Sequence, residues 1–107
     1  MKIVISAQDG KMESQVDQRF GRCQWLIVFD TETNEWEACE NPGVSQSGGA
    51  GVAAAQFVAD QKADVVMSGD FGPNAARAFS ASNIEMRRFT DEIKTVQDAI
   101  NQFVKDK

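Results

Sequence analysis

The order of apolar runs along the chain constrains its fold more strongly than any other feature. Three such runs, at residues 2–6, 24–30 and 35–40, precede the first helical pattern. The run QWLIVFD has no clean alternation of apolar and polar residues, which is typical of a strand buried on both faces. The run EWEACE does alternate, and it follows the turn-forming residues TETN. These features predict three strands, of which the second and third form an antiparallel hairpin.

The second half of the chain alternates helical and strand patterns. We expect a helix at residues 50–61, a strand at 63–68, a helix from Pro73 to Asn83, and a strand at 84–89. Proline suits the first turn of a helix, and asparagine tolerates the left-handed conformation that often ends one. Strand–helix–strand units imply parallel strands joined by right-handed crossovers.

A final helix is expected after Thr90, which can cap it, with the next two acidic residues at its positive end. Its buried stripe is predicted at Ile93, Val96, Ile100, Phe103 and Val104. The resulting order, β-β-β-α-β-α-β-α, predicts an α/β fold in which a mixed five-stranded sheet carries helices on both faces. All 107 residues fit a single domain, which we expect to be a monomer.

The balance of charges and the length of the apolar runs exclude two classes of partner. Sixteen acidic residues against 11 basic ones give a net charge of −5, whereas nucleic-acid binders normally show a basic surplus. No apolar run approaches the length of a membrane span, and the start of the chain lacks the pattern of a signal peptide. We therefore expect a cytoplasmic protein that binds neither nucleic acid nor membrane.

The scarcity of metal-binding and nucleophilic side chains removes much of enzyme chemistry. The sequence has no histidine and only two cysteines, Cys23 and Cys39. Common zinc sites, a Ser-His-Asp triad and a four-thiolate iron–sulfur cluster within one chain are all excluded. A hairpin that turns at TETN places Cys39 near Leu26 and out of register with Cys23, so no disulfide is expected between the two cysteines.

The stretch SGGAG, residues 47–51, resembles a phosphate-binding loop without its lysine. Ser47, Gly48, Gly49 and Gly51 would let an anion approach the unpaired N–H groups at a helix start. The pattern G-x-G-x-x-A also allows a dinucleotide interpretation, with Asp70 near the expected acidic spacing, but no strand directly precedes the glycines. Alternatively, the glycines merely allow a tight turn against the sheet.

Two further loops have a similar character. Residues 69–74, GDFGPN, also join a strand to a helix, so the two glycine-bearing helix starts could converge on one ligand. In the loop RFGRC, Arg19 and Arg22 offer fixed positive charge. Phe20 either covers a ligand or packs into the core. Cys23 is either a soft-metal ligand or a small buried side chain.

Taken together, these segments resemble a known family. The succession MKIVIS, RFGRC, FDTET, ENPG, GGAG, DVVMSG and GPNA is similar to the dinitrogenase iron–molybdenum cofactor biosynthesis family, from residue 1 to about residue 104. That family includes nitrogenase cofactor carriers and orange protein-like members. The resemblance implies a ribonuclease H-like three-layer fold and non-covalent binding of anionic metal–sulfur clusters.

The resemblance also implies which residues hold the cluster. The matching positions are Phe20, Gly21 and Arg22, then Gly48, Gly49, Ala50 and Gly51, then Gly72, Pro73, Asn74 and Ala75. Family members commonly have histidine where this chain has Arg19, which supplies charge but cannot ligate metal. Cys23 is then the one candidate metal ligand in these loops.

The sequence therefore predicts a non-catalytic carrier or scaffold for a molybdenum-containing sulfide cluster. An iron–molybdenum precursor, a molybdenum–copper sulfide and a simple iron–sulfide are all compatible with the residues. Cluster donor or acceptor proteins are the expected partners. One alternative is a small nucleotide- or phosphate-binding enzyme that uses the same loops. Another is an adaptor domain whose loops bind only protein.

Overall fold

The computed structural model describes residues 1–45 and 48–105, and within them the chain forms one five-stranded mixed sheet. The strands are β1 (Lys2–Ala7), β2 (Trp25–Asp30), β3 (Trp36–Glu40), β4 (Val65–Ser68) and β5 (Glu85–Arg88). Their spatial order is β3-β2-β1-β4-β5. The antiparallel pairs are β1–β2 and β2–β3, while β4 runs parallel to both β1 and β5.

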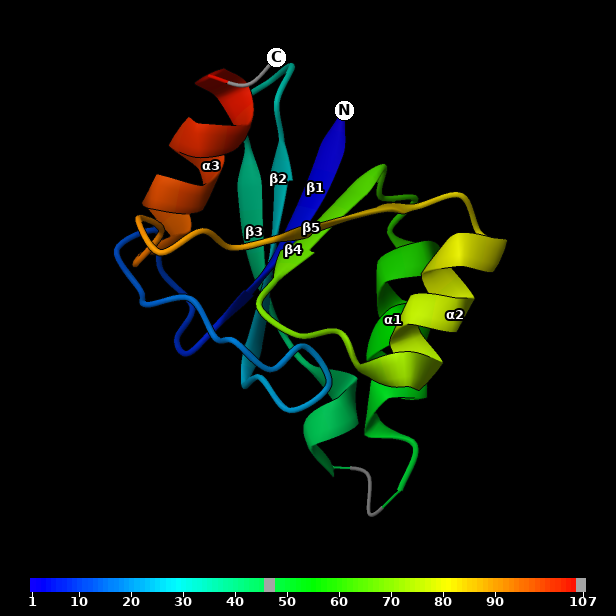
Figure 1. Cartoon of the computed structure of the whole chain (residues 1–107). Coiled ribbons are helices and arrows are strands. Elements are labelled where there is room, and N and C mark those ends of the chain that lie inside the picture. The colour runs from blue at the N-terminus through cyan, green and yellow to red at the C-terminus, as the bar shows by residue number, and fades with distance from the viewer. Residues whose placement is uncertain (46–47, 106–107) are drawn as a thin grey trace.

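Helices cover both faces of this sheet (Figure 1). They are α1 (Ala50–Asp60), α2 (Gly72–Ala81) and α3 (Val96–Lys105), with a short 3₁₀ helix, η1 (Pro42–Ser45), between β3 and α1. In Figure 1, α1 and α2 lie together on one face and α3 lies on the other. The predicted order of elements is confirmed, and η1 is the one addition within the described residues.

The two faces of the sheet form separate hydrophobic cores because successive strand residues point to opposite sides. Ile3 and Ile5 of β1 pack in the core under α3, together with Val96 and Phe103. Val4, between those isoleucines, packs in the core under α1 and α2. The central strand is thus buried on both faces, and the layered arrangement follows from it.

The direction of the strands determines where the connecting loops meet. Since β1 is parallel to β4, and β4 to β5, the loops that leave their carboxyl ends lie at the same end of the sheet. β3 is antiparallel to β2, which is antiparallel to β1, so the segment from β3 to α1 leaves the sheet at this end as well. Figure 1 shows η1, the start of α1 and the start of α2 there.

The last helix begins later than the sequence predicts. α3 starts at Val96 rather than after Thr90, and it is capped by Thr95. Thr95 Oγ1 accepts a hydrogen bond from Asp98 N–H at 3.1 Å, and Asp98 Oδ2 accepts one from Thr95 N–H at 3.0 Å. This reciprocal pair is a capping box, which Thr90 cannot form because Ile93 stands three residues after it.

Two other side-chain predictions are corrected or sharpened. Val104 is 51% exposed, so it lies at the rim of the predicted stripe and not in it. Cys39 pairs with Leu26 in the hairpin, as expected, and both cysteines are free. Among the described residues, no helix has both the length and the apolar character needed to cross a membrane.

Candidate functional site

A cavity of about 390 Å³ lies at the loop end of the sheet, and all three predicted loops line it. The lining residues are Arg19, Phe20, Gly21, Arg22, Gly49, Ala50, Gly51, Asp70, Gly72, Pro73 and Asn74. They come from the loop before β2, the start of α1 and the start of α2. Ligand sites in open α/β sheets occupy this position, outside the carboxyl ends of parallel strands.

The loop before β2 is fixed to the loop before α2 by main-chain hydrogen bonds. Phe20 N–H donates to the Asp70 carbonyl at 3.0 Å, and Asp70 N–H donates to the Gln18 carbonyl at 2.6 Å. Beneath them, the buried Ser6 hydroxyl donates to the Asp17 carbonyl at 2.6 Å. These bonds join the two segments, so Arg19 and Asp70 lie side by side on adjacent segments that line the cavity.

A buried asparagine joins the same loop to the segment before α1. Asn41 is 3% exposed, and its Nδ2 donates to the carbonyl oxygens of Cys23 at 2.9 Å and Gly21 at 3.3 Å. Its Oδ1 accepts a hydrogen bond from Gly43 N–H at 2.9 Å. A buried amide with both ends satisfied fixes its neighbours firmly, because any rearrangement would leave it unpaired.

One group of glycines lets the backbones of these loops approach closely. A Cβ atom at Gly43 would lie 2.5 Å from the Ala50 carbonyl oxygen and 3.0 Å from that of Gly21. A Cβ atom at Gly21 would lie 3.2 Å from the Cα of Gly51. Gly69 is restricted in the same way by Gln18. Gly21, Gly43 and Gly69 therefore allow close backbone packing at positions where a side chain would collide.

A second group of glycines has open space around it. An added Cβ at Gly48, Gly49 or Gly72 would meet nothing within 4 Å. Gly49 and Gly72 adopt left-handed backbone conformations, with φ of 74° and 76°. Such values favour glycine. These two residues therefore turn the chain into α1 and α2 while leaving the adjoining backbone accessible from the cavity.

The start of α1 presents N–H donors that have no hydrogen-bond acceptor among the described residues. Gly49 precedes the helix without a side-chain cap, and its carbonyl accepts the hydrogen bond from Ala53 N–H at 3.0 Å. The N–H groups of Ala50, Gly51 and Val52 therefore precede the first intrahelical bond and have no helical acceptor. The first turn of α1 contains no acidic residue. Donors of this kind attract anions, and the helix dipole adds partial positive charge.

The start of α2 differs because it has an anion of its own. Asp70 Oδ1 accepts a hydrogen bond from Gly72 N–H at 3.2 Å. The next residue, Pro73, has no N–H group. Asp70 is exposed and also lines the cavity. Asp70 was not among the predicted site residues, although its position two residues after the end of β4 is a recognisable signal for one.

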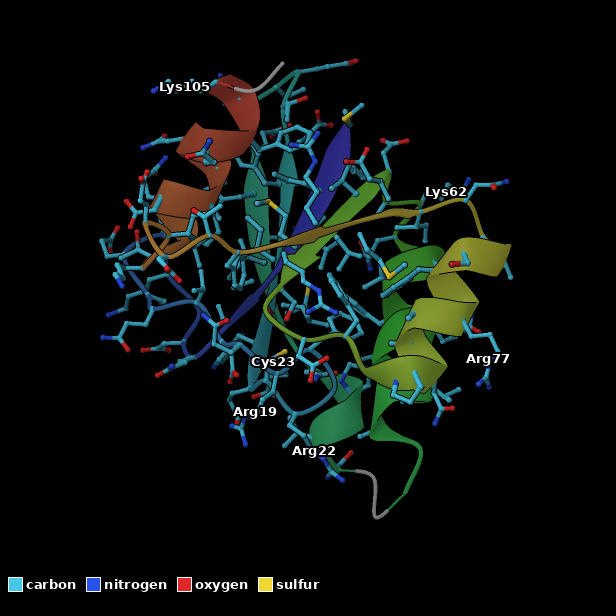
Figure 2. All side chains as sticks on the ribbon, viewed as in Figure 1. Arg19, Arg22, Cys23, Lys62, Arg77 and Lys105 are labelled. Carbon is cyan, nitrogen blue, oxygen red and sulfur yellow. The ribbon has the colours of Figure 1, made fainter. Side chains whose placement is uncertain are left out.

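Two arginines supply positive charge beside these helix starts. Arg19 and Arg22 line the cavity and are exposed, and Figure 2 shows both at the end of the molecule opposite Lys62 and Lys105. The side chain of Arg19 is 71% exposed, and its Nε lies 3.6 Å from Asp17 Oδ1. Arg22 makes no ion pair with any described residue. Both guanidinium groups can therefore turn toward a bound anion.

Phe20 forms the apolar floor of the cavity. Its side chain is fully buried, with its ring centroid 5.3 Å from that of Phe79 and 5.9 Å from that of Phe71. Of the two possibilities that the sequence left open, Phe20 packs into the core. It still contributes to the cavity lining from below. The floor is rigid because three rings contact one another.

Cys23 does not line the cavity. Its thiol is fully buried and donates a hydrogen bond to the Phe20 carbonyl at 3.1 Å, while Asn41 Nδ2 lies 3.5 Å from the sulfur. Burial, reinforced by the negative charge of Asp17, raises the pKa of this thiol to about 12. A protonated thiol is a poor metal ligand. Within the described residues, no group of three or more histidine, cysteine or acidic side chains could hold a metal ion.

Most of the predicted site residues lie together, and three of the described ones do not share the cavity lining. Gly48 and the buried Ala75 lie beside it, Cys23 lies behind Phe20, and Ser47 falls outside the described residues. Sequence reasoning overlooked Asn41, which stands in the segment ENPG between β3 and η1. A polar residue between a strand and a turn is only a weak signal, so its role became visible with the fold.

Comparisons with known proteins agree with this architecture. A family model described as "Dinitrogenase iron-molybdenum cofactor" matches residues 1–106. The apo orange protein from Desulfovibrio gigas is 32% identical, with a TM-score of 0.90 over 98% of this chain and 88% of that chain. A Thermotoga protein of the DUF35 family is 27% identical, with a TM-score of 0.83 over 97% of this chain and 87% of that chain. A search of curated proteins found no match.

These similarities confirm the predicted α/β fold with its mixed five-stranded sheet. The ribonuclease H-like label stays a prediction. Chemically, the cavity offers hydrogen-bond donors, two exposed guanidinium groups and an apolar floor. That combination suits an anion held by charge and hydrogen bonds, and it provides no set of ligands for direct coordination among the described residues.

Proposed function

The chain belongs to the dinitrogenase iron–molybdenum cofactor family, and we propose that it is a non-catalytic carrier for an anionic molybdenum-containing metal–sulfur cluster. The family and the similarity to orange protein indicate a cofactor-carrier role. The proposal adds the chemistry by which the cargo is held. It assigns the cluster to the cavity between the loop before β2, the start of α1 and the start of α2.

One observation carries this proposal: Ala50 and Gly51, whose N–H groups precede the first intrahelical bond of α1, line the same cavity as Arg19 and Arg22. A protein with a net charge of −5 repels anions at long range, so an anion site needs local positive charge. The arginines and the helix dipole supply it. Sulfide ligands of a cluster would accept hydrogen bonds from the N–H groups of Ala50, Gly51 and Val52.

In this mechanism the protein binds the cluster without a covalent bond. Each charge-assisted hydrogen bond contributes roughly 1.5–3 kcal/mol when well formed, so several together can retain a small anion. The buried Phe20 floor excludes water from one side of the cargo. Cys23 stays protonated behind that floor because its pKa is about 12, and it takes no part in ligation.

The cargo is proposed to be an iron–molybdenum precursor or a molybdenum–copper sulfide, since the cavity selects charge and size and not a particular heterometal. Proteins that donate or accept the cluster are its expected partners. The free cysteines fit a reducing compartment, and we place the protein in the cytoplasm as a monomer.

Anaerobic titration of the protein with tetrathiomolybdate, alone and with copper or iron, tests the proposal. We expect stoichiometric retention of molybdenum through gel filtration and shifted charge-transfer bands. Binding should weaken as salt increases, because charge pairing contributes to it. Inorganic phosphate and ATP serve as competing anions in parallel titrations.

Two results would contradict the carrier. The first is molybdenum that elutes entirely apart from the protein under every metal combination. The second is binding of micromolar ATP at the three loops with no binding of thiomolybdate there, which would support the nucleotide-binding alternative.

A further inference from the structure

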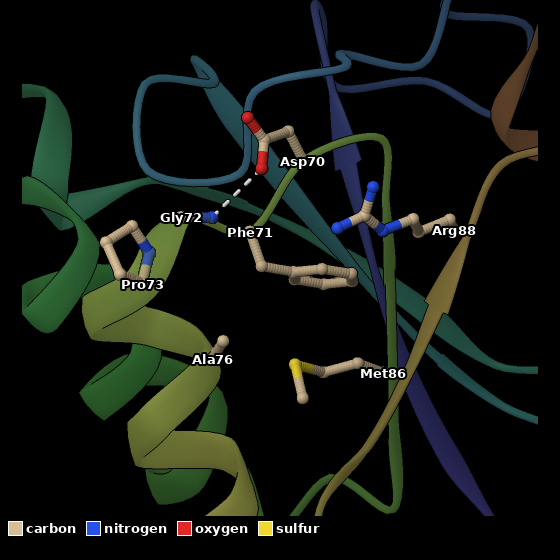
Figure 3. A pocket seen from close by; sticks show the side chains of 7 residues that line it. All are labelled: Asp70, Phe71, Gly72, Pro73, Ala76, Met86 and Arg88. Carbon is tan, nitrogen blue, oxygen red and sulfur yellow. Dashed lines mark hydrogen bonds between the residues drawn. The ribbon is translucent and has the colours of Figure 1, made fainter.

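A second cavity, of about 400 Å³, lies on the other side of the segment that connects β4 to α2. Figure 3 shows it between the first turns of α2 and the end of β5. Residues 70–73, Ala76, Met86 and Arg88 line it. It shares Asp70, Gly72 and Pro73 with the cavity assigned to the cluster, so the two spaces lie on opposite sides of one short segment.

The walls of this second cavity are mainly apolar. Phe71 is 6% exposed, and its ring contacts Phe79 in the core, so the ring is a rigid surface. In Figure 3 the Met86 side chain extends from β5 toward Ala76, beside the Phe71 ring. A thioether adapts to different ligand shapes because it is flexible and polarisable. The floor is therefore suited to the apolar body of a small molecule.

Arg88 is the cationic group of this cavity. Figure 3 shows its guanidinium directed from the end of β5 toward Phe71 and Asp70. It forms no ion pair or side-chain hydrogen bond with any described residue. The nearby carboxylate of Asp70 is instead hydrogen-bonded to Gly72 N–H.

The preceding residue provides a direct contrast. Arg87 points to the other face of the sheet, where it pairs with Glu85 and lies 4.8 Å above the Phe103 ring centroid. Adjacent arginines on one strand thus have different environments. Arg87 is used within the fold, whereas Arg88 is directed into a cavity and leaves its donors available for a ligand.

We propose that this cavity is a binding site for a small organic acid, with its apolar body against Phe71 and Met86 and its carboxylate paired with Arg88. The guanidinium fork matches a carboxylate in a two-bond arrangement. The volume falls within the range of roughly 300–1,000 Å³ that is usual for small-molecule sites, which are mostly apolar with few polar groups. This site is distinct from the cluster site and does not depend on it.

The shared segment predicts communication between the two sites. An acid bound beside Phe71 and Arg88 touches the same residues, Gly72 and Pro73, whose other side lines the cluster cavity. Occupation of one site should therefore alter the affinity of the other by a few-fold. The organic acid would act as a co-ligand or as a signal for loading.

The test is a titration of the ¹⁵N-labelled protein, without metal, with 3-phenylpropionate and with its neutral analogue 3-phenylpropionamide. We expect amide shifts in residues 70–72, 74–76 and 86–88. We also expect at least about tenfold tighter binding of the acid, which corresponds to about 1.4 kcal/mol. The variant R88Q should remove this preference, and R88K should retain part of it. R77Q, an exposed arginine of α2 that lines neither cavity, is the control.

Equal binding of acid and amide by the unaltered protein would overturn the proposal, as would an acid preference that survives in R88Q. Shifts confined to residues outside the lining of this cavity would also contradict it. The folding of each variant is checked by its thermal melt, and Arg88 is exposed, so no loss of folding is expected. Because no metal is present, failure here leaves the thiomolybdate titration unaffected, and the two proposals can fail separately.

Discussion

The starts of α1 and α2 are similar in backbone conformation and different in what they offer a ligand. α1 follows the left-handed Gly49, with φ of 74°, and α2 begins at the left-handed Gly72, with φ of 76°, and both helix starts open onto the same cavity. Neither has a side-chain cap at its N-cap residue. From backbone geometry alone, the two would be equivalent anion sites.

Asp70 and Pro73, which lie at the start of α2 and have no counterpart at α1, remove this equivalence. At α2 the carboxylate of Asp70 already accepts the Gly72 N–H, and Pro73 provides none. At α1 the first turn has no acidic residue, and three consecutive N–H groups precede the first intrahelical bond. We infer that α1 holds the anion and that α2 forms a wall whose own charge limits what can bind.

The largest effect is expected from disturbing the segment that sets the α1 start in place. In G43A the new methyl group would collide with the Ala50 carbonyl, since its Cβ would lie 2.5 Å from that oxygen. We expect about 1–3 kcal/mol lower free energy of unfolding, measured by chemical denaturation. G48A, whose methyl group would meet nothing within 4 Å, is the control and should change little. Equal stability of the two variants would show that close backbone packing does not position α1.

The next effect concerns the arginines on the α1 side of the cavity. The double variant R19Q/R22Q should bind tetrathiomolybdate about tenfold more weakly, or about 1.4 kcal/mol, because two charges beside the anion are lost. Its binding should also depend less on salt. R77Q, which keeps both cavity arginines, should bind as the unaltered protein does. An identical salt dependence in all three proteins would argue against charge pairing.

The two glycines at the start of α1, Gly49 and Gly51, should respond to alanine substitution with opposite changes in stability. G51A places a methyl group in ordinary contact with Ala75, 3.9 Å away, and should stabilise the helix by about 0.5–1 kcal/mol. G49A should destabilise the protein by about 1–2 kcal/mol because alanine disfavours a left-handed conformation. Thermal melts of both variants give the comparison. A change of the same sign in both would contradict the assigned backbone conformations.

A smaller effect is expected at α2. In D70N the resident negative charge is removed, and thiomolybdate affinity should rise about threefold, or about 0.6 kcal/mol. The control is E92Q, which removes an exposed charge outside this cavity. Isothermal titration calorimetry measures both. Weaker binding by D70N would mean that the carboxylate assists the anion site, and the contrast between the two helix starts would need to be reversed.

No effect on binding is expected at Cys23. C23S should retain thiomolybdate as well as the unaltered protein, because the thiol is buried behind Phe20 and stays protonated. The pKa is raised from 9.0 to about 12, so the unfolded chain loses this proton first as pH rises. Stability should therefore fall between pH 9 and pH 12, and C23S should remove that part of the fall. Loss of molybdenum retention in a folded C23S protein would instead support the hypothesis that the Cys23 thiolate ligates the metal.

The sequence predicted the meeting of the loops because strand direction alone requires it. Parallel β1 and β4 leave their loops at one end, and the short chain offers few other arrangements. The start of α3 was also open to prediction, since Thr95, unlike Thr90, has an acidic residue at the capping-box spacing, Asp98. The weaker criterion, acidic residues directly after Thr90, led to the wrong start.

Other features depend on contacts between distant segments and cannot be read locally. Gly43 and Gly49 are the same residue type, yet their roles differ. Gly43 lies close to two carbonyl groups, whereas Gly49 adopts the left-handed conformation that precedes α1. Asn41 acquires its partners only when the loop before β2 folds onto η1. Whether Phe20 covers the cavity or supports it was likewise decided by Phe71 and Phe79, which come from other elements.

The most direct test of the central claim is a residue-by-residue map of anion binding. In ¹⁵N–¹H spectra recorded anaerobically during a tetrathiomolybdate titration, the amides of Ala50, Gly51 and Val52 should shift most, and that of Asn74 should shift less. This pattern would assign the anion to the start of α1. Larger shifts at the start of α2, or shifts spread evenly over the surface with none concentrated at the cavity, would contradict the account.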